Sequence, residues 1–265
     1  MTCEFVRATA LDYFPCRYGQ SKVMFRGPRR RLDGRYVAVL GGTETYGKFI
    51  EEPYPALMEK ALDLPVVNFG CMNAGPDAFL AEPVILSACA RARVTVIQLM
   101  GAQNITNRFY AVHPRRNDRF LRASAQMKSI FPDIDFTEFN FTGHMLGTLK
   151  EAAPDRFRLV AEELKAAWTA RMRHLLQKID TPTVILWLQA GNSADPLVLN
   201  DAMIAAIRPF ATDFLRVTPS AAARMSGTEG MHFAPLEEPA AATMPGPLVH
   251  REVADVLGPV LRRLL

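Results

Sequence analysis

The sequence predicts an α/β protein, a three-layer α/β/α sandwich built around a mostly parallel five-stranded sheet. Short apolar runs rich in β-branched residues recur along the chain, and segments of helical periodicity separate them. Turn-rich segments follow most of the apolar runs. Strands that alternate with helices imply parallel pairing, with helices covering both faces of the sheet.

Five runs have the length and composition of buried strands. They are residues 36–40, 65–68, 94–100, 183–188 and 213–217. Helices are expected at residues 53–63, 77–92, 155–179, 197–210 and 248–264. Pro83 must occupy a first turn or a kink. Trp168 and the leucines spaced around it are typical of a core-facing helix stripe.

No internal repeat or low-complexity linker divides residues 1–265, so a single domain is predicted. Residues 107–150 are basic and aromatic and are typical of an insertion. We expect most of this segment to form helices joined by loops.

Composition favours a soluble, cytoplasmic protein. Apolar residues make up 49% and charged residues 22%, no apolar run reaches 18 residues, and the first residues lack a signal-peptide pattern. The four cysteines lack C-x-x-C spacing, which indicates reduced thiols. They are Cys3, Cys16, Cys71 and Cys89. We expect no metal site, cofactor or membrane partner.

The net charge of +4 is too small to indicate a nucleic-acid partner, and no RNA-binding motif is present. One basic cluster comprises Arg26, Arg29, Arg30, Arg31 and Arg35. We interpret it as a solvated loop, with polyanion binding as the alternative. The sequence does not decide the oligomeric state, and a homo-oligomer stays open.

Functional loops of parallel sheets lie at the carboxyl ends of the strands. Here they are residues 41–47, 70–76, 101–108, 189–195 and 218–232. In this order they resemble the blocks of the SGNH (GDSL-like) hydrolases. Gly41-Gly-Thr-Glu-Thr-Tyr-Gly47 resembles the nucleophile block, Asn73 occupies the glycine place of the second block, Gly101-Ala-Gln-Asn104 resembles the third, and Glu229-Gly-Met-His232 resembles the last.

The resemblance implies an acyl-enzyme mechanism. Thr43 would be the nucleophile, His232 the base and Glu229 the residue that orients the base. The oxyanion donors would be the backbone amides of Thr43 and Asn73 and the side-chain amide of Gln103 or Asn104. Thr45 and Cys71 are fallback nucleophiles without a motif behind them.

Several places differ from the family pattern. Thr43 adds a β-methyl to the nucleophile, Glu229 is one methylene longer than aspartate, and Asn73 adds a side chain where glycine leaves space. Two functions therefore stay open. One is an esterase or acyltransferase acting on an ester of a polar, carbohydrate-like or anionic small molecule, and the other is a binding module that kept the pocket.

Simpler interpretations of the glycine-rich turn also exist. Gly41 and Gly42 would suit a strand-to-helix turn that needs φ > 0. A phosphate-binding loop is disfavoured because the Gly-x-Gly-x-x-Gly and Gly-Lys-Ser/Thr patterns are both lacking.

The segment after the third block is expected to overhang the pocket and to bind the substrate through arginine and aromatic side chains. Its candidate residues are Arg108, Tyr110, His113, Arg115, Arg116 and Arg119. The equally weighted alternative is a solvated basic face.

Overall fold

The computed structural model describes residues 11–189 and 199–265, and its central sheet has five parallel strands. They are β1 (Val37–Gly41), β2 (Val66–Gly70), β3 (Val94–Gln98), β6 (Thr183–Leu188) and β7 (Asp213–Val217). Their order is β2-β1-β3-β6-β7, the doubly wound arrangement of flavodoxin-like folds. The predicted fold class is confirmed.

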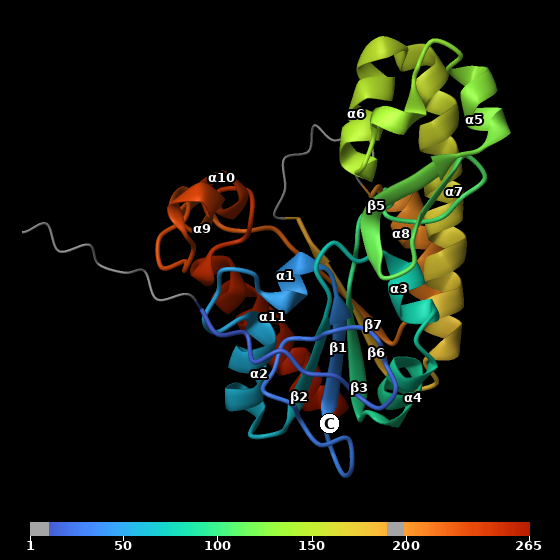
Figure 1. The fold of residues 1–265 in the computed structure, drawn as a ribbon. Coiled ribbons are helices and arrows are strands. Elements are labelled where there is room, and N and C mark those ends of the chain that lie inside the picture. Colours follow the sequence, from blue (N-terminus) through green and yellow to red (C-terminus); the bar gives the residue numbers. More distant parts are fainter. Residues whose placement is uncertain (1–10, 190–198) are drawn as a thin grey trace, which may run out of the picture.

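Helices cover both faces of this sheet. Their bounds are α1 (Thr43–Tyr46), α2 (Tyr54–Leu62), α3 (Pro76–Leu80), α4 (Pro83–Arg91), α7 (Pro154–Lys178), α8 (Asp201–Ile207), α9 (Ala221–Met225), α10 (Glu238–Ala241) and α11 (Pro247–Leu264). Short 3-10 turns are η2 (Arg208–Phe210) and η3 (Pro235–Glu237). Figure 1 shows α3, α4, α7 and α8 on one side of the sheet, and α2 and α11 on the other.

Successive side chains of a strand point to opposite faces of the sheet, and this divides the core into two layers. Val37 and Val39 belong to the cluster that includes α2 and α11, whereas Ala38 and Leu40 belong to the larger cluster on the opposite face. Trp168 is fully buried in this larger cluster, and its indole Nε1 donates to the Met100 carbonyl at 2.8 Å. Trp168 belongs to α7, and the core-facing stripe expected for this helix is confirmed.

The elements follow the sequence prediction closely, with two differences. The segment expected as one helix at 77–92 is two helices, and Pro83 opens the second of them at its first position. The loop expected at 189–195 lies outside the described residues from position 190 onward, as does Cys3.

The second difference lies between β3 and α7. The segment begins with an antiparallel hairpin rather than helices, formed by β4 (Tyr110–His113) and β5 (Arg116–Ala123). It continues with α5 (Ala125–Ile130), η1 (Phe136–Glu138) and α6 (Thr142–Ala152). In Figure 1 this segment, hereafter the insertion, stands beyond the carboxyl end of the sheet, while α9 and α10 lie on the other side of α1.

Arg26 corrects the interpretation of the first arginine cluster as a solvated loop. Its side chain is buried, and its guanidinium donates to the carbonyls of Gly47 at 2.6 Å and Glu51 at 2.7 Å, with a longer bond to Tyr46 at 3.3 Å. Burial lowers the pKa of Arg26. Two of these carbonyls lie at the C-terminal end of α1, where positive charge is favoured. Arg31, in contrast, is exposed and pairs with Asp33.

His250 is a second buried ionisable group, on α11. Its Nδ1 accepts the backbone N–H of Tyr54 at 3.1 Å, and its ring stacks on the Tyr54 ring. Burial, with a smaller contribution from the positive charge of Arg26, lowers the pKa of His250 to about 3. The fold therefore holds this histidine in its neutral form.

The helices and the cysteines bear on two sequence predictions, the lack of a membrane span and the reduced state of the thiols. Across residues 11–189 and 199–265, none of the helices combines the length and apolarity that a membrane span requires. Cys16, Cys71 and Cys89 carry free thiols.

Replacing Arg26 with methionine should strongly destabilise the protein. The variant keeps an apolar stem but leaves buried carbonyls of the α1 turn without a donor, which should cost on the order of 3 kcal/mol. Urea unfolding measures the change in free energy. Arg31→Ala is the matched control, since exposed ion pairs contribute about 0–1 kcal/mol. Equal losses in both variants would contradict a special role for Arg26.

The protein should lose stability as pH falls from 6.5 toward 3. In this window the unfolded chain protonates His250 while the folded chain does not, so each pH unit costs up to about 1.4 kcal/mol from this group. His250→Gln should show a shallower decline in urea unfolding between pH 6.5 and 4. His174→Gln, which removes an exposed histidine, should keep the wild-type decline, and an unchanged slope in His250→Gln would refute the assignment.

Candidate active site at the carboxyl edge of the sheet

Thr43 opens α1 directly beyond the end of β1, and two glycines allow α1 to lie this close to the sheet. A Cβ on Gly70 would be 2.2 Å from the Tyr46 backbone nitrogen, and one on Gly41 would be 2.0 Å from the Thr45 hydroxyl. The φ of Gly42 is −84°, and Gly41 is not among the residues with positive φ. Gly41 and Gly70 are needed for close approach, and the alternative interpretation that Gly41 and Gly42 supply φ > 0 is wrong.

Gln98, the last residue of β3, holds the turn from the neighbouring strand. Its Oε1 accepts the Gly42 N–H at 2.8 Å and the Thr45 hydroxyl at 3.1 Å. Thr45 also shares a 2.7 Å hydrogen bond with the Tyr54 hydroxyl and is fully buried. Thr45 therefore has a structural place, and we remove it as a fallback nucleophile.

The Thr43 hydroxyl lies against Asn73, as the order of the blocks predicts. The Asn73 backbone N–H donates to Thr43 Oγ1 at 2.9 Å, and the Thr43 hydroxyl donates to Asn73 Oδ1 at 3.3 Å. Asn73 has φ +55°, a left-handed conformation that asparagine tolerates better than most residues. Asn73 thus contacts the Thr43 hydroxyl through both its backbone and its side chain.

Asn104 supports the Asn73 loop and already has partners for both ends of its amide. Its Nδ2 donates to the Asn73 carbonyl at 2.9 Å, and its Oδ1 accepts the Thr142 hydroxyl at 2.8 Å. The side-chain amide of Gln103 folds over Gly101, where an added Cβ would lie 2.2 Å from Gln103 Oε1. Asn104 is therefore engaged within the protein, whereas the Gln103 side-chain amide lies against Gly101.

Two carboxyl groups that the motifs did not indicate lie close to Thr43. Asp118 of β5 accepts a hydrogen bond from Asn73 Nδ2 at 3.2 Å. Glu44 follows Thr43, and its carboxyl end turns inward toward Gly42 and Gln98. Burial raises the pKa of the Glu44 carboxyl.

His232 approaches the turn that follows α1. Its backbone N–H donates to the Phe49 carbonyl at 2.8 Å, and its Nε2 lies 3.7 Å from a carboxylate oxygen of Glu51. Glu229 is exposed, and its backbone N–H donates to the Ser226 carbonyl at 2.9 Å. The carboxylate beside the histidine ring is thus Glu51 rather than the predicted Glu229.

The predicted substrate-binding segment divides into buried and exposed members. Tyr110 is buried and its hydroxyl donates to the Gln103 carbonyl at 2.6 Å, while Arg108 pairs with Glu163 at 2.9 Å. The ring nitrogen Nδ1 of His113 accepts the backbone N–H groups of two following residues at 3.2 Å.

The remaining arginines of this segment differ in accessibility. Arg115 and Arg116 are exposed at the turn between β4 and β5. Arg119 follows Asp118, and its guanidinium lies 4.7 Å from the centre of the Phe141 ring. Its buried Nε has no hydrogen-bond partner within the described residues. Among the predicted residues, these three arginines are the ones left for an anionic or polar ligand.

Cys71 is a weak candidate for nucleophilic chemistry. Its thiol is buried, and burial, with a further contribution from the negative charge of Asp118, raises its pKa to about 11. Because the thiolate is the reactive form, this thiol is unreactive near neutral pH.

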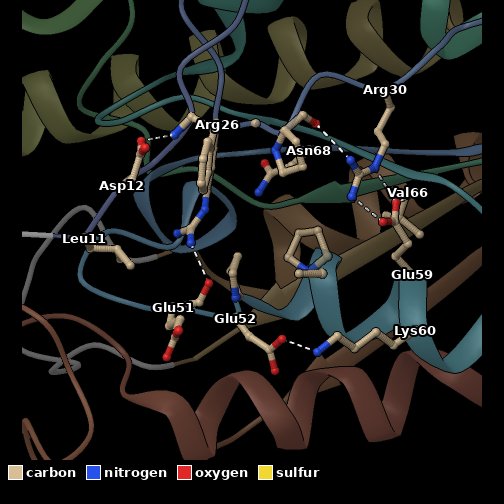
Figure 2. Close-up of a pocket in the computed structure, with 16 residues that line it drawn as sticks. Leu11, Asp12, Arg26, Arg30, Glu51, Glu52, Glu59, Lys60, Val66 and Asn68 are labelled. Carbon is tan, nitrogen blue, oxygen red and sulfur yellow. Dashed lines mark hydrogen bonds and ion pairs between the residues drawn. The ribbon is translucent and has the colours of Figure 1, made fainter.

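A groove of about 430 Å³ lies between the segment around Arg26 and helix α2, and Glu51, the carboxylate beside His232, is part of its lining (Figure 2). Four of its charged side chains form two ion pairs. Figure 2 shows Arg30 bound to Glu59, and Lys60 bound to Glu52. These two ion pairs, together with the engagement of Arg26 by backbone carbonyls, leave few cationic groups of the groove without a partner among the described residues.

A family model, described as a domain of unknown function (DUF6473), matches residues 1–265. The chain belongs to the DUF6473 family. A search of curated proteins finds no match.

Several solved structures resemble the DUF6473 chain. A catalytic mutant of Axe2, an acetylxylan esterase from Geobacillus stearothermophilus, is 14% identical with a TM-score of 0.45, covering 87% of this chain and 94% of that one. A two-domain esterase active on acetylated mannans is 14% identical with a TM-score of 0.45, covering 88% and 50%. The lipase Lip_vut3 from a goat rumen metagenome is 13% identical with a TM-score of 0.40, covering 84% and 97%. Similarity this distant leaves the function to be argued from the chain's own geometry.

Sequence reasoning missed Asp118, Glu44 and Glu51 as parts of this region. Glu44 had a usable signal, since it stands inside the nucleophile block beside Thr43. Asp118 and Glu51 had none, because only the folding of the insertion and of the turn after α1 brings them to the site.

Glu44→Gln should stabilise the protein more at neutral pH than at pH 4.5. Since the folded state raises the pKa of Glu44, its contribution to stability is present at low pH and is lost as pH rises through the folded pKa. Thermal unfolding at several pH values measures the difference. The control is Glu138→Gln on the exposed surface, and a gain for Glu44→Gln that is equal at all pH values would contradict the prediction.

Proposed function

We propose that this protein is an SGNH-like esterase or acyltransferase in which Thr43 is the nucleophile. The observation that carries the proposal is the 2.9 Å hydrogen bond from the Asn73 N–H to Thr43 Oγ1. It places a fixed backbone donor beside the oxygen that would attack, at the carboxyl edge where parallel sheets bind ligands.

The chemistry would run through an acyl-enzyme. Thr43 Oγ1 attacks the ester carbonyl, His232 takes the hydroxyl proton, and the carbonyl oxygen becomes an oxyanion. Collapse breaks the ester C–O bond, and His232 returns the proton to the departing alcohol. Water or another hydroxyl then accepts the acyl group, which gives hydrolysis or transfer.

The other groups have supporting roles in this proposal. The backbone amides of Thr43 and Asn73 and the side-chain amide of Gln103 would stabilise the oxyanion. Glu51 would orient His232 in place of Glu229, because it is the carboxylate beside the imidazole.

The proposed substrate is an acyl or acetyl ester of a polar small molecule, carbohydrate-like or anionic. Arg115, Arg116 and Arg119 would contact it from the insertion, because their guanidinium groups suit oxygen-rich ligands. The free thiols are in keeping with a cytoplasmic site of action.

A binding module is the second candidate function. The Thr43 hydroxyl donates its proton to Asn73 Oδ1 and accepts the Asn73 N–H through one lone pair, and the predicted orienting residue Glu229 is exposed. A module of this kind would bind the same acetylated, polar ligands without turning them over.

Turnover of p-nitrophenyl acetate and covalent labelling by a fluorophosphonate test the enzyme proposal. Thr43→Ala should abolish both. Thr43→Ser should raise the labelling rate because it removes the β-methyl beside the attacking oxygen. His232→Ala should lower kcat by roughly 10²- to 10⁴-fold. Mass spectrometry should locate the label on Thr43.

Thr137→Ala, an exposed threonine of the insertion, is the matched control and should behave as the wild type. If wild-type protein is neither labelled nor active on acetyl esters, the enzyme proposal fails. Calorimetric binding of an acetylated oligosaccharide without turnover would then favour the binding module.

A further inference from the structure

A chain of hydrogen bonds leads from the nucleophile place into the insertion. Thr43 Oγ1 and Asn73 Oδ1 are 3.3 Å apart, and Asn73 Nδ2 and Asp118 Oδ2 are 3.2 Å apart. The Asn73 side chain is therefore a bridge between Thr43 and a carboxylate on β5.

The chemistry of the three side chains determines which of them donates and which accepts in each of these hydrogen bonds. An amide has one donor end and one acceptor end, whereas an ionised carboxylate only accepts. Asp118 therefore holds the Asn73 NH₂ toward itself and turns Oδ1 toward Thr43. With Oδ1 on that side, the Thr43 hydroxyl donates its proton to Asn73.

The same loop is tied to the insertion at two further points. Asn117, fully buried beside Asp118, accepts the Gly75 N–H through Oδ1 at 2.9 Å. Thr142 at the start of α6 donates to Asn104, which in turn donates to the Asn73 carbonyl. Asp118 is thus held at a fixed place relative to the Asn73 loop.

We infer that Asp118 is a positioning residue, which sets the orientation of the Thr43 hydroxyl through Asn73. Through Asp118, the insertion contributes a side chain that orients the nucleophile. This inference rests on the proposed function of Thr43 and adds a residue that no motif indicates.

The consequence for reactivity is specific. In the ligand-free protein, one lone pair of Thr43 Oγ1 accepts the Asn73 N–H and the proton points at Asn73 Oδ1, so the second lone pair is left for the carbonyl carbon. As the attack proceeds, the proton leaves Asn73 Oδ1 for His232, the base of the proposed mechanism. Without Asp118 the Asn73 amide can rotate, and its NH₂ group would then compete for that lone pair.

Steady-state kinetics on p-nitrophenyl acetate, together with the fluorophosphonate labelling rate, measure this role. Asp118→Ala should lower kcat and the labelling rate about 10- to 100-fold while KM changes less than about threefold. Asp118→Asn should restore most of the rate, because its side-chain carbonyl still accepts from Asn73 Nδ2. Asp133→Ala removes an exposed carboxylate from the same insertion and should match the wild type.

Two results would overturn the inference. One is an Asp118→Ala protein with wild-type kcat. The other is an Asp118→Asn protein as slow as Asp118→Ala, which would show that negative charge rather than amide orientation matters.

A second measurement judges the bridge independently of catalysis. In ¹⁵N-labelled protein, the side-chain NH₂ signals of Asn73, assigned by their loss in Asn73→Ala, should shift in Asp118→Ala and stay near wild type in Asp133→Ala. If the wild type shows no labelling or turnover, the proposed function fails while this test still stands. Asn73 signals that do not move in Asp118→Ala refute the inference in either case.

Discussion

The close seating of α1 on the ends of β1 and β2 is the constraint on which the site depends. Backbone of α1 occupies the space that a side chain on Gly70 would need, and Gln98 and Arg26 hold the two ends of the turn with buried hydrogen bonds. Side chains of the turn can then point in few directions. The backbone position of Thr43 follows from the packing of α1 against the strand ends, and its contacts with Asn73 orient its hydroxyl.

The side chain of Asn73 distinguishes this site from one with glycine at the same position. A glycine at this left-handed position would keep the backbone hydrogen bond to the Thr43 hydroxyl, whereas the asparagine side chain adds a second contact and connects the hydroxyl to Asp118. Rigidity of this kind favours a preorganised hydroxyl, because fewer orientations need to be excluded when a substrate binds. It also connects the Thr43 hydroxyl to an insertion that lies far along the chain.

Arginines that look alike in the sequence have very different environments. Arg26 is buried and holds the turn of α1 by hydrogen bonds to carbonyls, while Arg31, five residues later, is exposed and forms a surface ion pair. The arginines of the insertion differ instead in their partners, since Arg108 and Arg116 are both exposed but Arg108 pairs with Glu163. Burial and neighbours, rather than residue type, decide which basic groups remain available to a ligand.

The sequence by itself determined the strands, most helices, and the meeting of Thr43 with Asn73. Strand and helix periodicity is local, and the ends of adjacent parallel strands necessarily share one edge of the sheet. Only the tertiary structure decided that Asp118 reaches Asn73, that Glu51 rather than Glu229 lies beside His232, and that Tyr110 is buried. Such contacts depend on how the hairpin and loops fold back over the sheet. The local pattern of apolar and polar residues does not predict hydrogen bonds between residues that are far apart in the sequence.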